Sequence, residues 1–217
     1  MTPMCRRRKA FPTLVYVITL LAPIGAAHAF PEDLFGYRQS AQVGLRTFPL
    51  WIDALERHVR QDLPDGSCEE LRMNRCHLEQ WLKFLDGVKG MQMREQLRAI
   101  NRYANTKPYV LDIDNYGVDD YWAISREFLA TGGDCEDYAI TKLFSLRWLG
   151  YRREDLRLVV VQDTNLRVPH AVLAVAADND ILILDNQVPE IISHRAIAHY
   201  APVYSMTDQS WWIHLPQ

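Results

Sequence analysis

The spacing of apolar residues changes at Gly150, and this change limits the fold of the chain more than any other feature of the sequence. Before Gly150, apolar side chains recur at the period of helices that bury one face. After Gly150, short runs rich in β-branched residues predict strands. Helices followed by strands predict an α+β domain. The predicted helices cover 48–63, 69–85, 91–103 and a stretch from Cys135 to the residue before Gly150, and the predicted strands cover 156–162, 170–176, 181–185 and 202–206.

Residues 1–29 have the three parts of a secretory signal peptide. Basic residues at 6–9 precede an apolar stretch at 11–24, and small residues end the segment. An uncleaved membrane anchor is the alternative, but Pro23 and a glycine interrupt a stretch already short for crossing about 30 Å of hydrocarbon. We therefore expect cleavage after residue 29, and a mature protein of residues 30–217 that forms one domain.

The charge of the chain disfavours one class of partner. The formal charge is −3 and falls to −7 without the predicted signal peptide, which holds four basic residues and no acidic residue. Nucleic-acid binding needs clustered lysine and arginine, so we expect no nucleic-acid partner. No repeat or low-complexity linker divides residues 30–217, and this length suits a single compact core.

The mature chain keeps an odd number of cysteines, which are Cys68, Cys76 and Cys135. Cys68 and Cys76 are close enough in sequence to close a small loop, so an oxidising compartment favours a disulfide between them. Two free thiols are one alternative. A zinc site that adds His77 is another, although the sequence lacks a second pair of ligands at zinc spacing.

Cys135 follows two glycines and Asp134, at the predicted first turn of an apolar helix. Asp134 is a suitable N-cap, and Asp137 three residues later gives a weak form of a capping box. Unpaired amide protons at a helix N-terminus stabilise a thiolate and can lower the pKa of a cysteine. The alternative is a small buried core residue. Because carboxylates flank the thiol and the glycines allow close approach of other chains, we interpret Cys135 as a nucleophile.

A predicted hairpin brings a histidine close to a carboxylate. The segment 177–180 is typical of a tight turn between two antiparallel strands. If Ala176 pairs with Ile181, His170 and Asp185 lie diagonally on the same face, within reach of each other. A surface histidine and a turn aspartate are the alternative. With a nucleophilic thiol elsewhere in the chain, the pair is typical of a general base and the residue that orients it.

Seven segments, in order over most of the mature chain, form a recognisable set. They are Asp119-Asp120-Tyr121-Trp122, Glu127-Phe128-Leu129, Gly133-Asp134-Cys135-Glu136-Asp137-Tyr138-Ala139-Ile140, Leu149-Gly150, Pro169-His170-Ala171-Val172-Leu173-Ala174, Leu184-Asp185-Asn186 and Pro202-Val203-Tyr204-Ser205. Together they resemble the bacterial transglutaminase-like cysteine proteinases, and within them the LapG-type periplasmic proteases. The resemblance implies a papain-like or transglutaminase-like α+β fold, with the nucleophile on a helix N-terminus packed against an antiparallel sheet. It also implies that Cys135 is the nucleophile, His170 the base and Asp185 the orienting carboxylate.

The resemblance also implies a calcium cofactor, because the family is calcium dependent and its acidic residues beside the nucleophile correspond to Asp134 and Glu136. Calcium takes six to eight oxygen ligands, so Asp137, carbonyl groups or water would complete the site. Helix capping by Asp134 and a solvated Glu136 are the alternative roles. A second acidic run at 112–117 starts like an EF-hand loop but departs from that pattern at its fifth and twelfth positions.

By the same resemblance, the chain is a periplasmic cysteine endopeptidase. Such proteases cut a large surface adhesin at a di-alanine site in the N-terminal module that retains it in the outer membrane, which disperses the biofilm. An inner-membrane receptor for cyclic diguanylate inhibits them through its periplasmic domain. Two alternatives use the same residues differently: an amidase or transamidase acting on cell-envelope amides, and a non-catalytic calcium-binding adaptor.

Aromatic residues leave two further questions open. The Cys135 amide can supply one oxyanion hydrogen bond, and Tyr121 and Trp122 are candidates for the second donor because they precede the motif. Packing is their alternative role. Trp211 and Trp212 are candidates for anchors of a protein interface, with core packing as the alternative.

Overall fold

The structure is a computed structural model that describes residues 30–60 and 63–217. The predicted signal peptide lies outside the described residues. Within these ranges, no helix is long and apolar enough to cross a bilayer. The helices are α1 (Pro49–Val59), α2 (Arg75–Val88), α3 (Met93–Asn105), α4 (Asp112–Asn115), α5 (Ser125–Thr131) and α6 (Cys135–Trp148), and the strands are β1 (Asp33–Leu34), β2 (Tyr37–Gln42), β3 (Leu156–Asp163), β4 (Val168–Ala177), β5 (Asp180–Leu184), β6 (Ile192–Ser193), β7 (Tyr200–Met206) and β8 (Trp211–Pro216).

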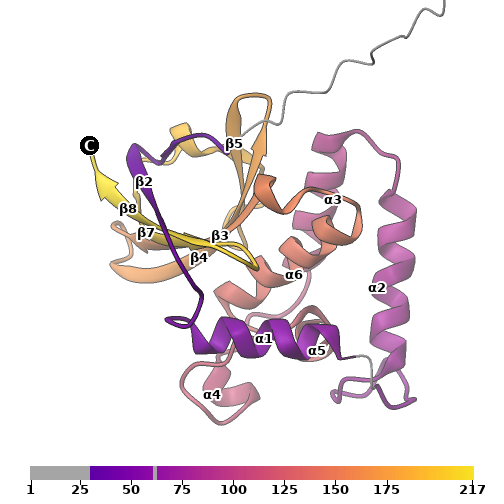
Figure 1. The fold of residues 1–217 in the computed structure, drawn as a ribbon. Coiled ribbons are helices and arrows are strands. Elements are labelled where there is room, and N and C mark those ends of the chain that lie inside the picture. The colour runs from indigo at the N-terminus through magenta and orange to yellow at the C-terminus, as the bar shows by residue number, and fades with distance from the viewer. Residues whose placement is uncertain (1–29, 61–62) are drawn as a thin grey trace, which may run out of the picture.

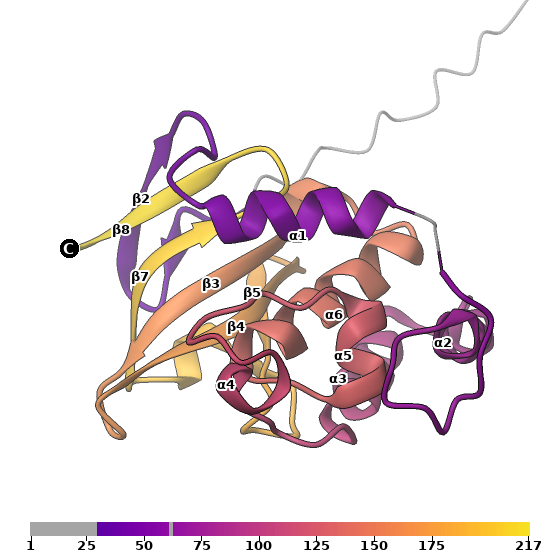
Figure 2. The ribbon, with the colours of Figure 1, turned by 90° about the horizontal axis from the view of Figure 1, so that it is seen from below.

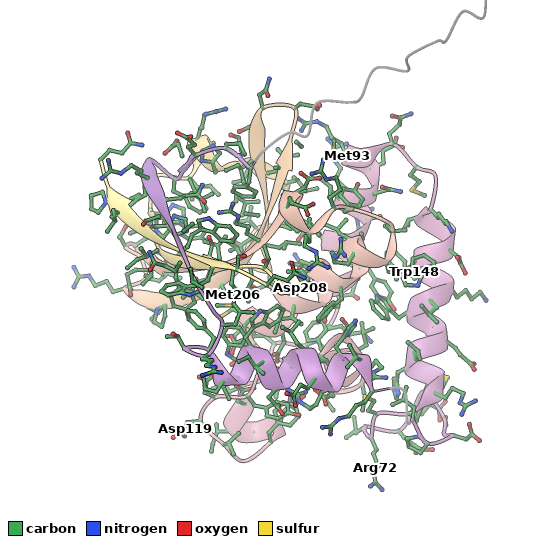
Figure 3. All side chains as sticks on the ribbon, in the orientation of Figure 1. Arg72, Met93, Asp119, Trp148, Met206 and Asp208 are labelled. Atoms are coloured by element: carbon green, nitrogen blue, oxygen red, sulfur yellow. A yellow bond between two sulfur atoms is a disulfide. The ribbon has the colours of Figure 1, made fainter. Side chains whose placement is uncertain are left out.

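A curled antiparallel sheet lies beside a group of helices, which confirms the predicted α+β class (Figures 1 and 2). The strand order is β1-β2-β8-β7-β3-β4-β5-β6. Helix α6 packs against β3 and β4 at the centre of the sheet, and α3 and α5 pack against α6 in turn. Side chains fill the space between α6 and the sheet (Figure 3).

Helix α6 is the centre of the core because it is buried on every side, and its sequence is not amphipathic. Ala139, Ile140, Leu143 and Leu146 are all buried against the sheet or the other helices. A helix with no exposed polar face is typical of the interior of a protein. It begins at Cys135, as predicted, and ends before Gly150, whose φ of 94° is unfavourable for any other residue.

The central strands are buried on both faces, which explains why their sequences are continuous apolar runs and do not alternate. On one face of β3 and β4, Leu158 and Leu173 join the core shared with the helices. On the other face, Val159 and Val172 join a second cluster with Phe30 from the start of the described chain. The two faces together place β4, which carries His170, deep inside the protein.

The β4–β5 hairpin has the predicted register. Ala176 pairs with Ile181, and Ala177 pairs with Asp180. The two turn residues, Asp178 and Asn179, have φ values of 51° and 63°. Two successive residues with positive φ form the tight turn that matches the twist of a hairpin, and asparagine and aspartate tolerate it best. This turn fixes which residues of β4 and β5 lie opposite each other.

The disulfide between Cys68 and Cys76 is present, as predicted, with Cα atoms 5.2 Å apart. The zinc and free-thiol alternatives are therefore wrong. The bridge also explains a boundary error: α2 was expected from residue 69 but begins at Arg75. Residues 68–74 form turns inside the disulfide loop, and Asn74 caps the helix by accepting a hydrogen bond from the Cys76 amide at 2.9 Å.

Four strands and two short helices were not predicted from the sequence. Strand β2 is polar and half-exposed, and it pairs with β8, the strand that carries the two consecutive tryptophans. The Trp212 ring lies 3.5 Å from the Arg157 guanidinium carbon, and Trp211 packs edge-on against Phe48 at 5.1 Å between ring centroids. Both tryptophans therefore have packing partners within the chain. The other elements missed were β1, β6, α4 and α5.

Candidate active site

Cys135 and His170 line the same small cleft, of about 350 Å³, although they are far apart in the sequence. Cys135 is the first residue of α6, and His170 lies on β4, the strand against which α6 packs. The structure thus brings together the predicted nucleophile and the predicted base. The other residues that line the cleft are Tyr109, Asp120, Trp122, Asp134, Glu136, Val160, Pro169, Ala171 and Tyr204.

Asp185 holds the His170 ring from the side of Nε2. The Nε2 to Oδ1 distance is 2.9 Å, and both side chains are 2% exposed. The Gln187 backbone amide donates to the same oxygen at 2.9 Å, and the Tyr200 hydroxyl donates to Oδ2 at 2.7 Å. Burial opposes ionisation of Asp185, but these hydrogen bonds, with that from His170 foremost, lower its pKa below the ordinary value. Asp185 is therefore a buried anion.

The hydrogen bond to Asp185 decides which nitrogen of His170 is available as a base. An ionised carboxylate can only accept, so Nε2 carries a proton and Nδ1 is the remaining basic atom. The Gln187 side-chain amide lies 3.5 Å from Nδ1. Tyr200 and Gln187 were both missed from the sequence, because a hydroxyl and an amide near strand ends give no pattern of their own.

The Cys135 thiol donates to the Glu136 carboxylate at 3.2 Å. Burial, followed by the charges of Glu136 and Asp134, raises the pKa of this thiol well above its ordinary value. The expected lowering by the helix N-terminus is therefore wrong for the site as it stands. The field of a helix end acts on one side of the sulfur, whereas desolvation and two carboxylates oppose the thiolate more strongly.

Five carboxylates cluster around the start of α6. The predicted ligands Asp134 and Glu136 are joined by Asp112, Asp120 and Asp137, and three-residue groups of these have ligand atoms within 4.8 Å of one another. Burial and neighbouring negative charges raise the pKa of Asp134 to about 8. Burial likewise raises the pKa of Asp112 to about 6, although the Tyr121 amide donates to it at 2.6 Å and opposes the shift.

Asp112 is a further candidate ligand, which was not predicted because the run at 112–117 departs from the EF-hand pattern. It lies in α4, and an isolated parallel bridge between Tyr109 and Gly133 brings the chain before α4 alongside the Cys135 motif. No local spacing rule could have found this approach. The Oδ1 atoms of Asp112 and Asp134 are buried without a hydrogen-bond donor.

Asp137 is engaged in holding the loop. Its carboxylate is fully buried and accepts from the Ala123 amide at 2.7 Å and from the Asp134 amide at 3.3 Å. The second bond is the capping interaction expected from the sequence. A Cβ atom at Gly133 would collide with this carboxylate, and one at Gly132 would collide with the Pro108 carbonyl. The two glycines are therefore required by close packing, as the sequence suggested.

The carboxylate cluster fits a hard divalent cation. Buried anions of like sign repel one another, and oxygen ligands at several angles are what calcium prefers. Asp134, Glu136 and Asp112 have the correct donor chemistry, and two of them carry a buried oxygen without a donor. Backbone carbonyls and water would supply the remaining ligands.

Comparison with known proteins identifies the family of the chain. A family model described as bacterial transglutaminase-like cysteine proteinase BTLCP matches residues 68–217. The chain belongs to this family. The LapG structure from Legionella pneumophila is 28% identical to the proteinase. The match covers 76% of this chain and 83% of LapG, with a TM-score of 0.59.

Two further LapG structures from L. pneumophila are similar to the proteinase. A calcium-bound form is 29% identical over 75% of this chain and 85% of LapG, with a TM-score of 0.58. An EGTA-treated form is 26% identical over 80% of this chain and 87% of LapG, with a TM-score of 0.59. No curated protein matches the chain. The likeness confirms the transglutaminase-like α+β fold and a LapG-type protease.

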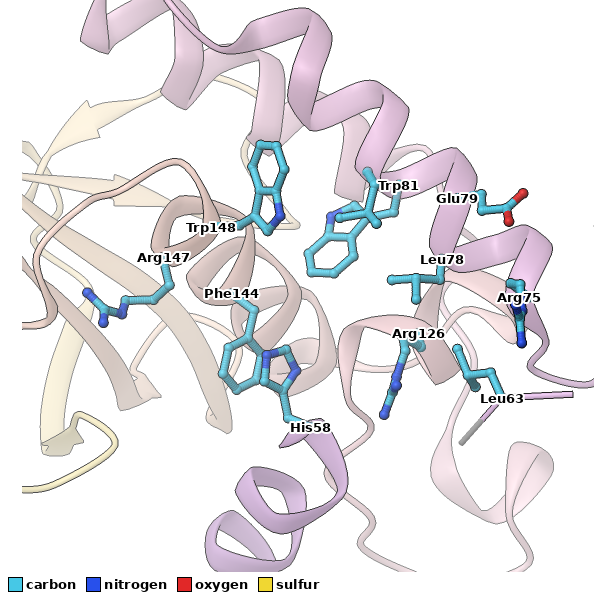
Figure 4. Close-up of a pocket in the computed structure, with 11 residues that line it drawn as sticks. His58, Leu63, Arg75, Leu78, Glu79, Trp81, Arg126, Phe144, Arg147 and Trp148 are labelled. Atoms are coloured by element: carbon cyan, nitrogen blue, oxygen red, sulfur yellow. The ribbon is translucent and has the colours of Figure 1, made fainter. Parts of the chain in front are cut away.

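A larger cavity, of about 740 Å³, lies elsewhere on the proteinase, between the ends of α1 and α6 and the side of α2 (Figure 4). The stacked rings of His58 and Phe144 line it, with 3.5 Å between their centroids. Burial lowers the pKa of His58 to about 4, so this histidine is neutral. Neither Cys135 nor His170 lines this cavity, and its chemistry is separate from the cleft.

Of the two candidates for the second oxyanion donor, only Trp122 lines the cleft. The Tyr121 backbone amide donates to Asp112 at 2.6 Å, and the Tyr121 hydroxyl donates to Glu127 at 3.3 Å. The Tyr121 ring also packs at a tilt against Tyr116, with ring centroids 4.1 Å apart. Its contacts are therefore those of a packing residue that supports the carboxylate cluster.

Proposed function

We propose that this LapG-type proteinase is a calcium-dependent periplasmic endopeptidase that cuts the N-terminal retention module of a large surface adhesin at a di-alanine site. Cleavage would release the adhesin and promote biofilm dispersal. The observation that carries the enzymatic part is the shared cleft of Cys135 and His170, with Asp185 fixed on the far side of the ring.

The reaction follows from this geometry. The Cys135 sulfur attacks the peptide carbonyl after its proton passes to His170, and the Cys135 amide at the start of α6 donates to the oxyanion. His170 then protonates the leaving amine, and water hydrolyses the thioester with the same imidazole as base. Asp185 keeps Nε2 protonated and stabilises the imidazolium that forms between these steps.

Asp134 and Glu136, joined by Asp112, would hold the calcium ion. When bound, a divalent cation there offsets the negative charge beside the sulfur and fixes the loop that begins α6. A hard cation has little affinity for thiolate, so these carboxylates are its ligands and Cys135 stays available. The calcium-bound and EGTA-treated forms of the similar LapG support a calcium site in this family.

The substrate, the location and the regulation rest on the family resemblance. A di-alanine site suits the small volume of the cleft, about 350 Å³. The signal-like pattern at 1–29 supports periplasmic location. An inner-membrane receptor whose periplasmic domain binds the protease when cyclic diguanylate is abundant would keep it inactive.

Cleavage of a purified adhesin N-terminal module tests the proposal. Residues 30–217 should cut the module with calcium, and should fail with chelator or as Cys135→Ala. Asp134→Asn should lose calcium binding and activity together, whereas the exposed Asp86→Asn serves as a matched control and should retain both. Full activity of Asp134→Asn in chelator would refute the calcium role.

Two measurements separate the alternatives. Product masses distinguish hydrolysis from transfer to an amine, because a transamidase joins the acyl group to the amine. Iodoacetamide labelling distinguishes a protease from an adaptor. With calcium present, Cys135 in a protease should react faster than an ordinary exposed cysteine, whereas an inert thiol should not.

A further inference from the structure

Three of the residues that line the active-site cleft form one row across the sheet. Ala171 on β4 pairs with Val160 on β3, and Val160 pairs with Tyr204 on β7, the next strand of the sheet (Figure 1). Residues directly opposite each other on neighbouring strands point to the same face. All three line the cleft with Cys135 and His170. One side of the cleft therefore begins at the residue after His170, and its side chains grow from alanine to valine to tyrosine.

The row lies on the face of the sheet that carries α6. Two residues away along the same three strands, Leu173, Leu158 and Met206 join the core shared with the helices. Side chains two residues apart on a strand point to the same face, and neighbouring strands lie about 4.8 Å apart. Tyr204 is thus two strands, or about 10 Å, from Ala171. A peptide whose carbonyl reaches the sulfur has room above the two smaller residues and meets an aromatic ring beyond them.

A β-bulge places Tyr204 in this row in place of its neighbour Val203. Val161 on β3 pairs with Pro202, but the pairing then shifts by one residue, so that Val160 pairs with Tyr204. A regular ladder would put Val203 opposite Val160, and a shift of one residue exchanges the side chains on the two faces. Val203 is instead the extra residue of the bulge and is 48% exposed. Bulges of this kind re-aim side chains beside active sites.

The Tyr204 ring is supported by other aromatic rings. Its centroid lies 4.8 Å from that of Phe48, the residue before α1, and Phe48 packs edge-on against Trp211 at 5.1 Å. A ring packed in this way cannot swing aside without opening a void and losing its aromatic contacts. Tyr204 is therefore a rigid boundary of the cleft.

We propose that Tyr204 is the specificity residue that limits this proteinase to small side chains beside the scissile bond. The inference rests on the proposed function, in which a peptide carbonyl approaches Cys135, and it explains how a di-alanine site would be selected. A large side chain above Ala171 and Val160 collides with the ring, whereas alanine does not. Tyr204 takes no part in proton transfer, so it decides which peptide is cut and not how it is cut.

Cleavage of altered adhesin modules tests the inference. In two modules, leucine replaces the first or the second alanine of the di-alanine site. Wild-type kcat/KM should be at least about tenfold lower for these modules than for the alanine module, because a pocket discriminates by about 10- to 200-fold for one methylene. Tyr204→Leu should reduce this ratio at least about tenfold at one of the two positions. Tyr204→Phe keeps the ring and should keep the wild-type ratio, as should the matched control Val203→Ala, which alters the exposed neighbour.

A second readout does not depend on the adhesin. With calcium present, the rates at which iodoacetamide and the bulkier N-benzyl iodoacetamide alkylate Cys135 measure the size preference of the cleft itself. Tyr204→Leu should reduce the ratio of these two rates about tenfold, even if no module is cut. A wild type that cuts no module would count against the proposed function alone, because the alkylation ratio tests Tyr204 separately.

Three outcomes would overturn the inference. The first is a Tyr204→Leu variant that is folded by near-ultraviolet circular dichroism and has wild-type ratios in both assays. The second is loss of the size preference in Tyr204→Phe, which would assign it to the hydroxyl. The third is an equal change in Val203→Ala, which would assign it to the bulge and not to the ring. If Tyr204→Leu does not fold, Tyr204→Met, whose flexible side chain adapts to the space beside Phe48, takes its place in each comparison.

Discussion

The stability of the protein should depend on pH through Lys142. Its pKa is about 7 in the folded chain and 10.5 as a free side chain. Each pKa unit corresponds to about 1.4 kcal/mol, so burial of the charged form costs on the order of 5 kcal/mol relative to the neutral form. Lys142→Met removes this cost, and the variant should be more stable than the wild type at pH 6 by up to that amount.

The sign of the pH dependence follows from proton binding. Between pH 7 and 10, the unfolded chain keeps the lysine proton and the folded chain has released it. The free energy of unfolding of the wild type should therefore rise through this window, by at most about 1.4 kcal/mol per pH unit. Lys142→Met should lack this rise, so the two proteins should converge near pH 10.

Urea unfolding of both proteins at pH 6, 7.5 and 9 measures the effect, with the disulfide intact and a common m-value as the check that both transitions expose the same surface. Subtracting the two curves removes the contributions of all other titrating groups. Parallel curves, with a constant difference across the three pH values, would refute the assignment of Lys142 as a buried ammonium.

Three further predictions concern other residues. Cys68→Ser with Cys76→Ser should lower the free energy of unfolding by about 2–3 kcal/mol, since the bridge closes a loop of eight residues, and urea unfolding with and without reductant checks this. Asp112→Asn should weaken calcium binding in titration calorimetry, whereas the exposed Asp114→Asn should not. Tyr200→Phe should lower kcat by about tenfold or more, with KM unchanged in steady-state cleavage assays, because one hydrogen bond to a charged group is lost.

Local patterns predicted the parts of the fold that local chemistry determines. The start of α6 at Cys135 follows from a capping carboxylate and an apolar helix, and the pairing of Ala176 with Ile181 follows from a two-residue turn. The 2.9 Å contact between His170 and Asp185 is a consequence of that register.

Features that depend on contacts between residues far apart in the sequence could not be predicted from local patterns. Strand β2 is polar and half-exposed, so no apolar pattern marks it, and its place in the sheet depends on β8 at the other end of the chain. Asp112 reaches the carboxylate cluster only through the bridge between Tyr109 and Gly133. The direction of the Cys135 pKa shift depends on how deeply packing buries the sulfur, which the sequence does not encode locally.

The β4–β5 hairpin has a consequence for the order of assembly during folding. His170 and Asp185 are fifteen residues apart and joined by a two-residue turn, so the loop entropy of bringing them together is small. Cys135 joins them only when α6 docks on the sheet across a longer stretch of chain. We therefore expect the imidazole–carboxylate pair to form early, in a chain that cannot yet cleave anything, and peptidase activity to arise only in the last docking step.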